Sequence, residues 1–415
     1  MASKGGSGLY AAVDVGTSKM CCLIARGEEA GGLRVVGIGH NVARGIEAGT
    51  VVDMEAAEAT LAAAVQSAER MAGERIESVV VNVSAGRPAS QMVAVEVAVG
   101  GHEIGERDIR RVLQTSRGSL AESERAVVQC FPVGYTVDGT NGIRDPRGMV
   151  GERLGVTVHV VNAASGALRN LEGCVARSHL DVRARVATPY ASALATLVDD
   201  EKDLGVTVVD MGAGTTSAAV FLDGACVHTE VVPIGGHHVT NDIARVLSTP
   251  PAHAERMKTL YGSAVASRDD DREVLDVPAL GEGFAGGTNH IPRSLLVSII
   301  RPRVEETLEM VRNRIEAAGL HRSAGRRLVL TGGASLLQGT RELAGQIFGK
   351  QVRVGQPIWL KGLNEAMGGP SFAACAGLLR YAQRDAGDAI PGPWVAQAGL
   401  LERFGRFGQW LKENL

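Results

Sequence analysis

Two stretches of the sequence place an aspartate, glycines and hydroxyl side chains between apolar runs. Residues 205–227 read GVTVVDMGAGTTSAAVFLDGACV, with Asp210 just before the glycines. Residues 10–29 read YAAVDVGTSKMCCLIARGEE, with Asp14 in the same place, and both copies contain the order Val-Asp-x-Gly. Backbone N–H groups and hydroxyls in a glycine turn can hold phosphate oxygens. A nearby carboxylate can hold a hydrated magnesium ion, so both stretches are candidates for a phosphate site.

The apolar runs around these glycines predict β-hairpins. β-branched residues before Asp210 indicate a buried strand, and Asp-Gly at 223–224 predicts a second hairpin turn. A Rossmann site needs a helix after its glycines, and a P-loop needs a hydroxyl after its lysine; GQIFGKQ at 345–351 has the wrong spacing and no such hydroxyl. One glycine hairpin alone is most often only a hairpin. Two similar copies about half a chain apart favour two facing halves with phosphates between them.

A third glycine pair follows another apolar run. The residues LVLT at 328–331 predict a strand, and Gly332 and Gly333 separate it from a helix-like segment. Glycines at such a junction let the backbone approach a flat or charged ligand closely. An ordinary strand-to-helix turn explains this pair equally well when it is taken alone.

Length and composition indicate a globular chain with more than one subdomain. The 415 residues are too many for one ordinary core, and 45% are hydrophobic against 21% charged. The net charge of −3 favours no nucleic-acid partner. The six cysteines form no CxxC pair, the N-terminal residues lack the apolar core of a secretory signal, and no apolar run approaches the roughly 18 residues of a membrane span. We therefore expect a reduced, cytoplasmic protein.

The three motifs together resemble those of the actin-like ATPase superfamily. The stretches beginning at Asp14 and Asp210 resemble its two phosphate motifs, and LTGGASLLQG at 330–339 resembles its adenosine motif. Longer segments at 142–163, 231–262 and 368–382 are similar to the FtsA family of bacterial cell-division proteins. The resemblance covers nearly all of residues 9–384.

The resemblance implies a two-lobed α/β fold, actin-like (ribonuclease H-like), with an inserted subdomain called 1C. Strand and helix periodicity within 93–139 supports a separate unit there. Helices at 187–197 and 370–381 would lie between the lobes. The implied parts are a disordered N-terminus at 1–8; subdomain 1A at 9–84, 166–202 and 355–384; 1C at 85–165; subdomains 2A and 2B at 203–354, with 2B at about 236–310; a linker at 385–398; and a C-terminal membrane helix at 399–415.

The resemblance also implies ATP and Mg²⁺ as ligands. Asp14 and Asp210 would hold the magnesium ion through water, and Arg303 and Glu306 would approach the adenine. The implied phosphate contacts are Gly16, Thr17, Ser18, Lys19, Gly212, Gly214, Thr215 and Thr216. The implied adenosine contacts are Gly332, Gly333 and Ala334. A solvated turn is the alternative for Lys19, and a solvated helix face for Arg303 and Glu306.

The C-terminal residues LLERFGRFGQWLKENL predict an amphipathic helix. Its apolar arc has basic side chains near its edges, a pattern typical of an interfacial membrane anchor. The arc comprises Leu400, Leu401, Phe404, Phe407, Trp410 and Leu411. A helix docked on its own protein is the alternative. The preceding prolines and glycines indicate a flexible linker, and the FtsA family carries a membrane helix at this place.

The resemblance implies a function at the cytoplasmic face of the inner membrane, at the division site. The chain would tether the C-terminal tail of the tubulin-like protein FtsZ, polymerise with itself, and recruit later division proteins through 1C. The tail would bind 2B, with Arg293 as a candidate contact. Three alternatives remain: a PilM-like pilus adaptor, which has no terminal anchor; a small-molecule kinase, which has no use for one; and an MreB-like filament, in which the 85–165 segment would be misplaced.

Slow ATP hydrolysis is expected of the purified chain, with the nucleotide acting mainly as a structural and switching ligand. Residues 187–197, ATPYASALATL, carry part of the catalytic surface in related chaperones but contain no acidic side chain to orient water. Positioning is a large share of phosphoryl-transfer catalysis. Phosphate release under saturating Mg·ATP should therefore proceed well below about 1 s⁻¹, the lower end of typical enzyme turnover. A brisk turnover would contradict this prediction.

Overall fold

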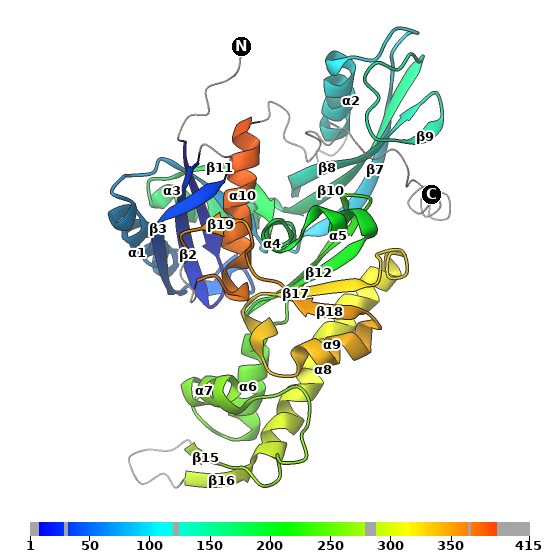
Figure 1. The fold of residues 1–415 in the computed structure, drawn as a ribbon. Helices are drawn as coiled ribbons and strands as arrows, with labels where there is room; N and C mark the ends of the chain where they lie inside the picture. The colour runs from blue at the N-terminus through cyan, green and yellow to red at the C-terminus, as the bar shows by residue number, and fades with distance from the viewer. Residues whose placement is uncertain (1–7, 29–31, 119–123, 279–287, 364–366, 388–415) are drawn as a thin grey trace.

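The chain folds into two lobes, each built around a mixed β-sheet (Figure 1). A computed structural model describes residues 8–28, 32–118, 124–278, 288–363 and 367–387. Within those ranges no helix is long and apolar enough to cross a membrane. Residues 1–7 of the predicted N-terminal segment 1–8, most of the predicted linker and the whole predicted membrane helix lie outside the described residues.

The two sheets repeat one topology. In each, three antiparallel strands are followed by two strands that add in parallel beside the first, so the central strands are β1 and β12. The first sheet has the order β11-β6-β1-β2-β3-β19, from Asp181–Ala187, Ser78–Val83, Leu9–Val15, Lys19–Gly27, Leu33–Val42 and Leu360–Lys361. The second has the order β14-β13-β12-β17-β18, from Ala225–Val232, Thr216–Leu222, Val206–Met211, Arg327–Thr331 and Gln351–Val354. The internal repeat seen in sequence is thus a repeat of structure.

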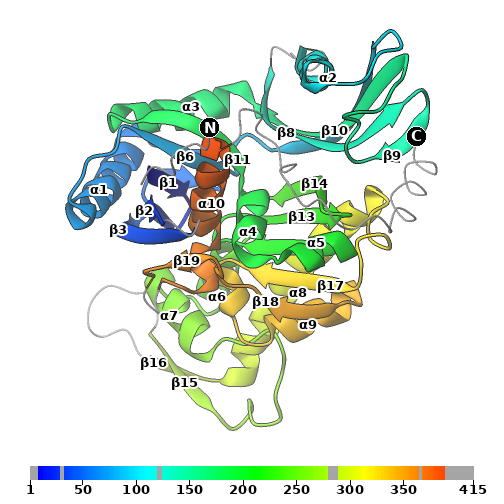
Figure 2. The same ribbon diagram turned by 45° about the horizontal axis from the view of Figure 1, so that its top comes forward.

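Two helices, α4 (Thr188–Thr196) and α10 (Ala373–Gly387), pack against each other between the sheets (Figure 2). α10 contacts β1, β2 and β6 of the first sheet, whereas α4 contacts β12 and β13 of the second. Every residue of α4 is buried, as its small and apolar composition allows. Helix α1 (Met54–Ala72) covers β2 and β3, and α3 (Ser165–Arg177) contacts α1 and β11.

The expected interdomain helices differ from the observed ones at their ends. The segment expected at 370–381 begins as a short 3-10 turn, η2 (Pro370–Phe372), and α10 then runs on to Gly387. Ala, Gln and Arg after Tyr381 are good helix formers, so the helix continues beyond the expected end at 381. The Asp223-Gly224 turn forms as expected, with φ of 49° and 83° at its two residues.

A third, four-stranded antiparallel sheet contacts strand β11 of the first lobe sheet and strand β14 of the second. Its order is β7-β10-β8-β9, from Ala89–Ala98, Arg153–Ala164, Arg125–Val137 and Thr140–Ile143. Helix α2 (Glu106–Gly118) contacts β7 and β10 and shares a separate hydrophobic core with them. Residue alternation in this part of the sequence therefore marks a unit with its own core.

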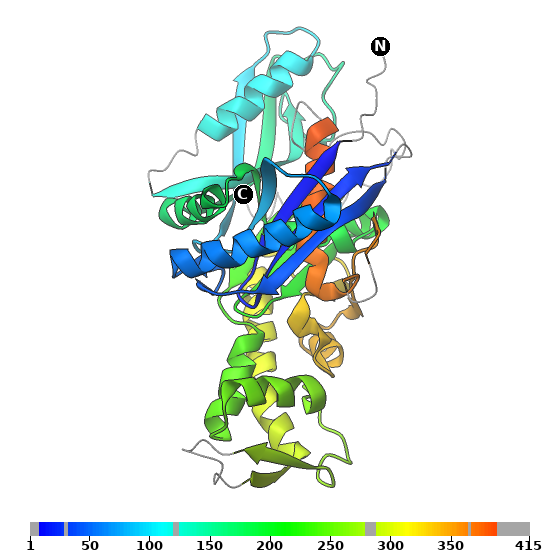
Figure 3. The same cartoon turned by 90° about the vertical axis from the view of Figure 1, so that its left-hand side faces the viewer.

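The opposite end of the molecule carries a small helical unit (Figure 3). It contains the hairpin β15-β16 (Val274–Pro278 and Thr288–Pro292). The long helix α8 (Arg293–Ala317) runs from this hairpin back to the second sheet, where it contacts β13 and β14. The other helices of the second lobe are α5 (Asp199–Leu204), α6 (Gly236–Val246), α7 (Pro251–Tyr261), η1 (Gly333–Leu336) and α9 (Thr340–Phe348).

Substitution of Gly377 by alanine should destabilise the contact between the two interlobe helices. A methyl group there would overlap the carbonyl oxygen of Ala191 in α4. Because both helices are packed between sheets, we expect a loss of about 2–3 kcal/mol in the free energy of unfolding, measured by urea titration. The matched control is Gly345→Ala in α9, where the nearest atoms are 3.7 Å from the added carbon. That control should be neutral or stabilising by up to about 1 kcal/mol; equal behaviour of the two variants would contradict the prediction.

Candidate functional site

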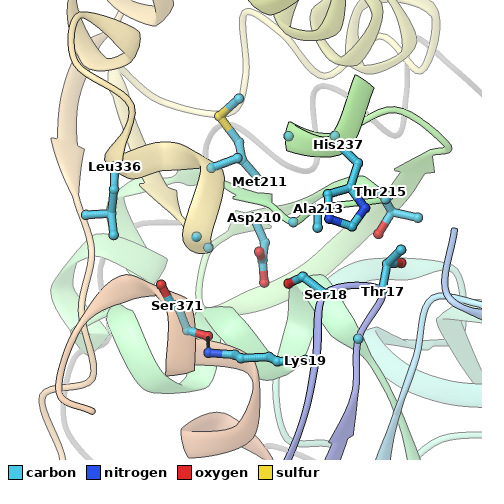
Figure 4. Close-up of a pocket in the computed structure, with 18 of the residues that line it drawn as sticks. Thr17, Ser18, Lys19, Asp210, Met211, Ala213, Thr215, His237, Leu336 and Ser371 are labelled. Carbon is cyan, nitrogen blue, oxygen red and sulfur yellow. Dashed lines mark hydrogen bonds between the residues drawn. The ribbon is translucent and has the colours of Figure 1, made fainter. Parts of the chain in front are cut away.

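A cavity of about 560 Å³ opens between the lobes and is lined from both of them. The turn between β1 and β2 faces the turn between β12 and β13 across it. Figure 4 shows Thr17, Ser18 and Lys19 of the first turn together with Asp210 and Thr215 around the second. The two candidate stretches found in sequence are therefore brought to one site.

The two turns have the same hydrogen-bonded form. The N–H of Gly16 donates to the carbonyl of Lys19 at 3.1 Å, and the N–H of Gly212 donates to the carbonyl of Thr215 at 2.9 Å. A β-carbon on Gly16 would lie 2.8 Å from the Lys19 carbonyl oxygen, and one on Gly212 would lie 2.9 Å from the Thr215 carbonyl oxygen. Glycine is thus required at both positions by close approach of the backbone.

The turns also touch each other. A side-chain carbon on Gly214 would overlap the hydroxyl oxygen of Thr17 from the opposite lobe. The Thr17 hydroxyl in turn accepts a hydrogen bond from the N–H of Gly49 at 3.2 Å. Contact between the glycine turns sets how closely the lobes approach at this end of the cavity.

Two carboxylates line the cavity near the ends of the central strands. Asp14 lies next to the end of β1 and Asp210 next to the end of β12, and both are over nine-tenths buried. Burial raises the pKa of Asp14 to about 6, Lys19 opposes the rise, and the charge of Asp210 adds to it. Burial also raises the pKa of Asp210 to about 6, opposed by a hydrogen bond from the Ser192 hydroxyl and by Lys19.

This donor set fits a hard divalent cation that keeps water ligands. Burial raises the pKa of both carboxylates, and the charge of Asp210 raises that of Asp14 further, so a bound cation would favour their ionised forms. The described residues contain no group of three or more His, Cys, Asp or Glu side chains arranged to hold a metal. Mg²⁺ commonly binds through one or two carboxylates plus water and phosphate oxygens, so Asp14 and Asp210 suit it.

Lys19 links the first turn to the start of the last helix. Its ammonium donates to the carbonyl oxygen of Ser371 at 2.5 Å and lies 3.2 Å from the centre of the Phe372 ring. Burial lowers its pKa, although the neighbouring Asp14 raises it. The side chain is therefore partly buried and held at the cavity wall by these two contacts.

The other end of the cavity is lined by one charged pair and by several apolar side chains. Helix α7 contributes Glu255 and Lys258, and the ammonium of Lys258 donates to the carboxylate of Glu255 at 2.7 Å. Apolar side chains from three elements complete this end: Leu260, Val304, Leu336 and Leu337. The diglycine Gly332-Gly333 lies between this end and the carboxylates, since a β-carbon on Gly332, whose φ is 83°, would overlap Asp210. A flat apolar ring with polar edges matches such walls.

Most of the residues expected around a nucleotide line this cavity. They are Asp14, Gly16, Thr17, Ser18, Lys19, Asp210, Gly212, Gly214, Thr215, Gly332, Gly333 and Ala334. Thr216 does not: its hydroxyl is buried and donates to the carbonyl of Ile234 at 2.8 Å. Arg303 and Glu306 also lie outside it and pair with each other on α8, while Val304 and Thr307 of the same helix face the cavity.

Arg293, expected to meet a partner's tail, is already paired within the chain. Its guanidinium donates to Asp270 at 2.6 Å, and its side chain is 15% exposed. It does not line the cavity. The expected membrane contacts Leu400, Leu401, Phe404, Phe407, Trp410 and Leu411 lie outside the described residues.

Sequence reasoning missed residues that line the cavity, such as Asn82 and His237, and also Ser192, which lies behind it. Asn82 ends the apolar run of β6 and accepts the N–H of Val15 at 2.7 Å, which fixes the strand beneath Asp14. Ser192 reaches Asp210 from α4. His237 follows the Gly235-Gly236 pair at the start of α6, and burial lowers its pKa. Two sequence signals could have pointed to these residues: the asparagine near the end of an apolar strand, and the second diglycine before His237.

Comparison with known proteins decides the family. The model described as "Cell division protein FtsA" matches residues 207–377, and that described as "SHS2 domain inserted in FTSA" matches residues 85–162. The cell division protein FtsA of Rhizobium meliloti (strain 1021) is 43% identical over 98% of this chain and 95% of its own length. The chain belongs to the FtsA family. FtsA proteins of Pseudomonas aeruginosa and Escherichia coli (strain K12) are 36% and 32% identical, covering 94% and 90% of this chain and 93% and 90% of their own lengths.

Solved structures confirm the actin-like fold. A chain of the PilM–PilN type IV pilus biogenesis complex matches 91% of this chain and 99% of its own length, with a TM-score of 0.63 at 18% identity. MreB5 of Spiroplasma citri bound to ADP matches 92% of this chain and 99% of its own length, with a TM-score of 0.52 at 13% identity. Likeness at this level establishes fold and not function. The near-full-length FtsA relatives therefore exclude the pilus-adaptor, kinase and MreB alternatives as the family of this chain.

The variant Asp14→Asn should stabilise the ligand-free protein at pH 7.5. A carboxyl whose pKa rises from 3.8 unfolded to about 6 folded costs stability as pH rises through that interval, and the cost is complete above pH 6. Asparagine removes that cost, so we expect the free energy of unfolding to rise by about 2 kcal/mol at pH 7.5 and to change little at pH 4. The control is Asp181→Asn at an exposed position. Destabilisation by Asp14→Asn at pH 7.5 would show that Lys19, not burial, governs this carboxyl.

Proposed function

We propose that this FtsA-family protein binds Mg·ATP between its lobes and tethers filaments of FtsZ to the cytoplasmic face of the inner membrane at the division site. The observation that carries the proposal is the pairing of two matching glycine turns and two buried carboxylates in one cavity. Near-full-length similarity to cell-division FtsA proteins supports a role in cell division. The nucleotide serves mainly as a structural and switching ligand.

The nucleotide phosphates would lie between the two glycine turns. Their backbone N–H groups and the hydroxyls of Thr17, Ser18 and Thr215 supply donors, and Lys19 supplies positive charge at the wall. Bound Mg²⁺ would neutralise Asp14 and Asp210 and the phosphates together. The base would occupy the apolar end beside Gly332, Gly333 and Ala334. Val304 and Thr307 are better placed to approach it than Arg303 and Glu306.

Hydrolysis is proposed to be slow because the described residues at the phosphate end offer no carboxylate, apart from Asp14 and Asp210, to orient an attacking water. Helix α4 presents Thr188 to the cavity, and the buried Ser192 of the same helix donates its hydroxyl to Asp210. Both Asp14 and Asp210 face the predicted cation site, which leaves them poorly placed to act as a base on water. Polar contacts that hold a nucleotide without orienting water suit a switch more than a rapid ATPase.

The C-terminal segment would supply membrane attachment. Its apolar arc and basic edge residues suit the surface of an anionic bilayer, and one short helix binds reversibly. Self-association of the chain would multiply weak helices into firm attachment. The FtsZ tail would bind the unit built from α6, α7, α8 and β15-β16, and the separate four-stranded unit would contact later division proteins. Arg293 remains a candidate tail contact, using N–H groups beyond those already bonded.

Liposome co-sedimentation tests the tether. The full chain is compared with a chain ending at residue 395, on vesicles of neutral and anionic phospholipid, with and without Mg·ATP and with FtsZ filaments. Only the full chain should pellet with anionic vesicles and carry FtsZ down, because only it contains the apolar arc.

A full-length Trp410→Glu variant is the matched control, and it should pellet less than the parent chain. Supernatant recovery of every form under all conditions would contradict the membrane anchor. Equal pelleting of the full and shortened chains would instead place the lipid contact on the folded body.

A further inference from the structure

An ion pair between a half-buried arginine and a buried aspartate lies behind the apolar end of the cavity. Arg293, the first residue of α8, donates from Nη1 to Asp270 at 2.6 Å. The Asp270 side chain is only 2% exposed, and it also accepts the N–H of Ser267 at 2.7 Å. A carboxylate buried to this extent and fixed by the backbone gives the guanidinium one defined position.

The same guanidinium ties two separate walls of the cavity together. Its Nε donates to the carbonyl oxygen of Tyr261 at the end of α7, at 2.8 Å. Its Nη2 donates to the side-chain oxygen of Gln338, which follows η1, at 3.0 Å. These two partners are far apart in sequence, and Gln338 itself lines the cavity.

The residues next to those partners form the apolar end. Leu260 and Gly262 line it on either side of Tyr261, and Leu337 lines it beside Gln338. The N–H of Ala264 donates to the Gln338 carbonyl at 2.7 Å, so the two walls also meet through the backbone. Arg293 does not line the cavity, yet it holds the side chain and the carbonyl that set the spacing of its walls.

We propose that Arg293 is a positioning residue for the base end of the nucleotide cavity, acting through Gln338 and the Tyr261 carbonyl. The inference rests on the proposed nucleotide binding and adds a residue outside the cavity to it. Arginine is suited to the task because its planar fork fixes several acceptors at once. Lysine would keep the charge beside Asp270 but could not span the three partners in this geometry.

The position of Arg293 predicts a selective defect. Loosening the walls around Leu260, Gly262 and Gln338 should weaken binding of the base and leave the glycine turns unaffected. ATP contacts both ends of the cavity, whereas inorganic tripolyphosphate can contact only the phosphate end. The ratio of the two affinities therefore separates positioning at the base end from general loss of structure.

The test measures binding of Mg·ATP and of Mg·tripolyphosphate to the full chain by calorimetry. Arg293→Lys should weaken ATP binding about tenfold and leave tripolyphosphate binding within about twofold of the parent. The double variant Asp270→Asn with Arg293→Gln should behave in the same way, because removing both charges leaves no unpaired buried ion. The matched control is Arg314→Lys, at the other end of α8, where Arg314 pairs with Glu230. It should change neither affinity.

Equal loss of both affinities, or loss of neither, in folded variants would overturn the inference while the proposed function stands. Melting temperatures show whether each variant is folded. If Arg293→Lys unfolds, the affinities of the double variant decide the test. Failure of the parent chain to bind either compound would overturn the proposed nucleotide binding itself and this inference with it.

Discussion

The mutual burial of Asp14 and Asp210 is the constraint around which the cavity is built. Each carboxylate lies near the end of the central strand of its own sheet, and burial makes ionisation of both costly. Lys19 and Ser192 offset part of that cost from different elements. The glycine turns beside them leave space that side chains would fill. Two buried carboxylates with raised pKa values make this part of the cavity electrostatically suited to a cation.

The lobes meet in two places of different character. At the cavity mouth, glycine turns touch through Gly214 and Thr17. Between the sheets, α4 and α10 touch through backbone and small side chains, including Gly377 against Ala191. A ligand in the cavity can separate the two glycine turns, whereas α4 and α10 form an apolar contact with no space for a ligand. Relative motion of the lobes should therefore pivot near the helices and open at the turns.

Local pattern explains how much of the site could be predicted from sequence. The strand–glycine–strand copies were readable because a hairpin is a local structure, and the Asp-Gly turn at 223–224 has the expected positive φ values. The roles of Ser192 and Asn82 could not be predicted from sequence, because the residues they bond to lie in other elements of the chain. On α8 the prediction selected Arg303, whereas Val304 faces the cavity, since charge alone does not tell which side of a helix faces a ligand. The family resemblance supplied the architecture; the amphipathic C-terminal segment remains a prediction.

The order of segments in the chain has a consequence for synthesis on the ribosome. The second sheet is built from one continuous run, Val206–Val354, so its lobe can fold as soon as that run has emerged. The first sheet begins at Leu9 but takes β19 and the covering helix α10 from the chain after residue 359. Its N-terminal strands must wait for the last helix before their apolar face is covered. The lobe that is translated first is thus the lobe completed last, and its exposed strands are the natural target of chaperones during that interval.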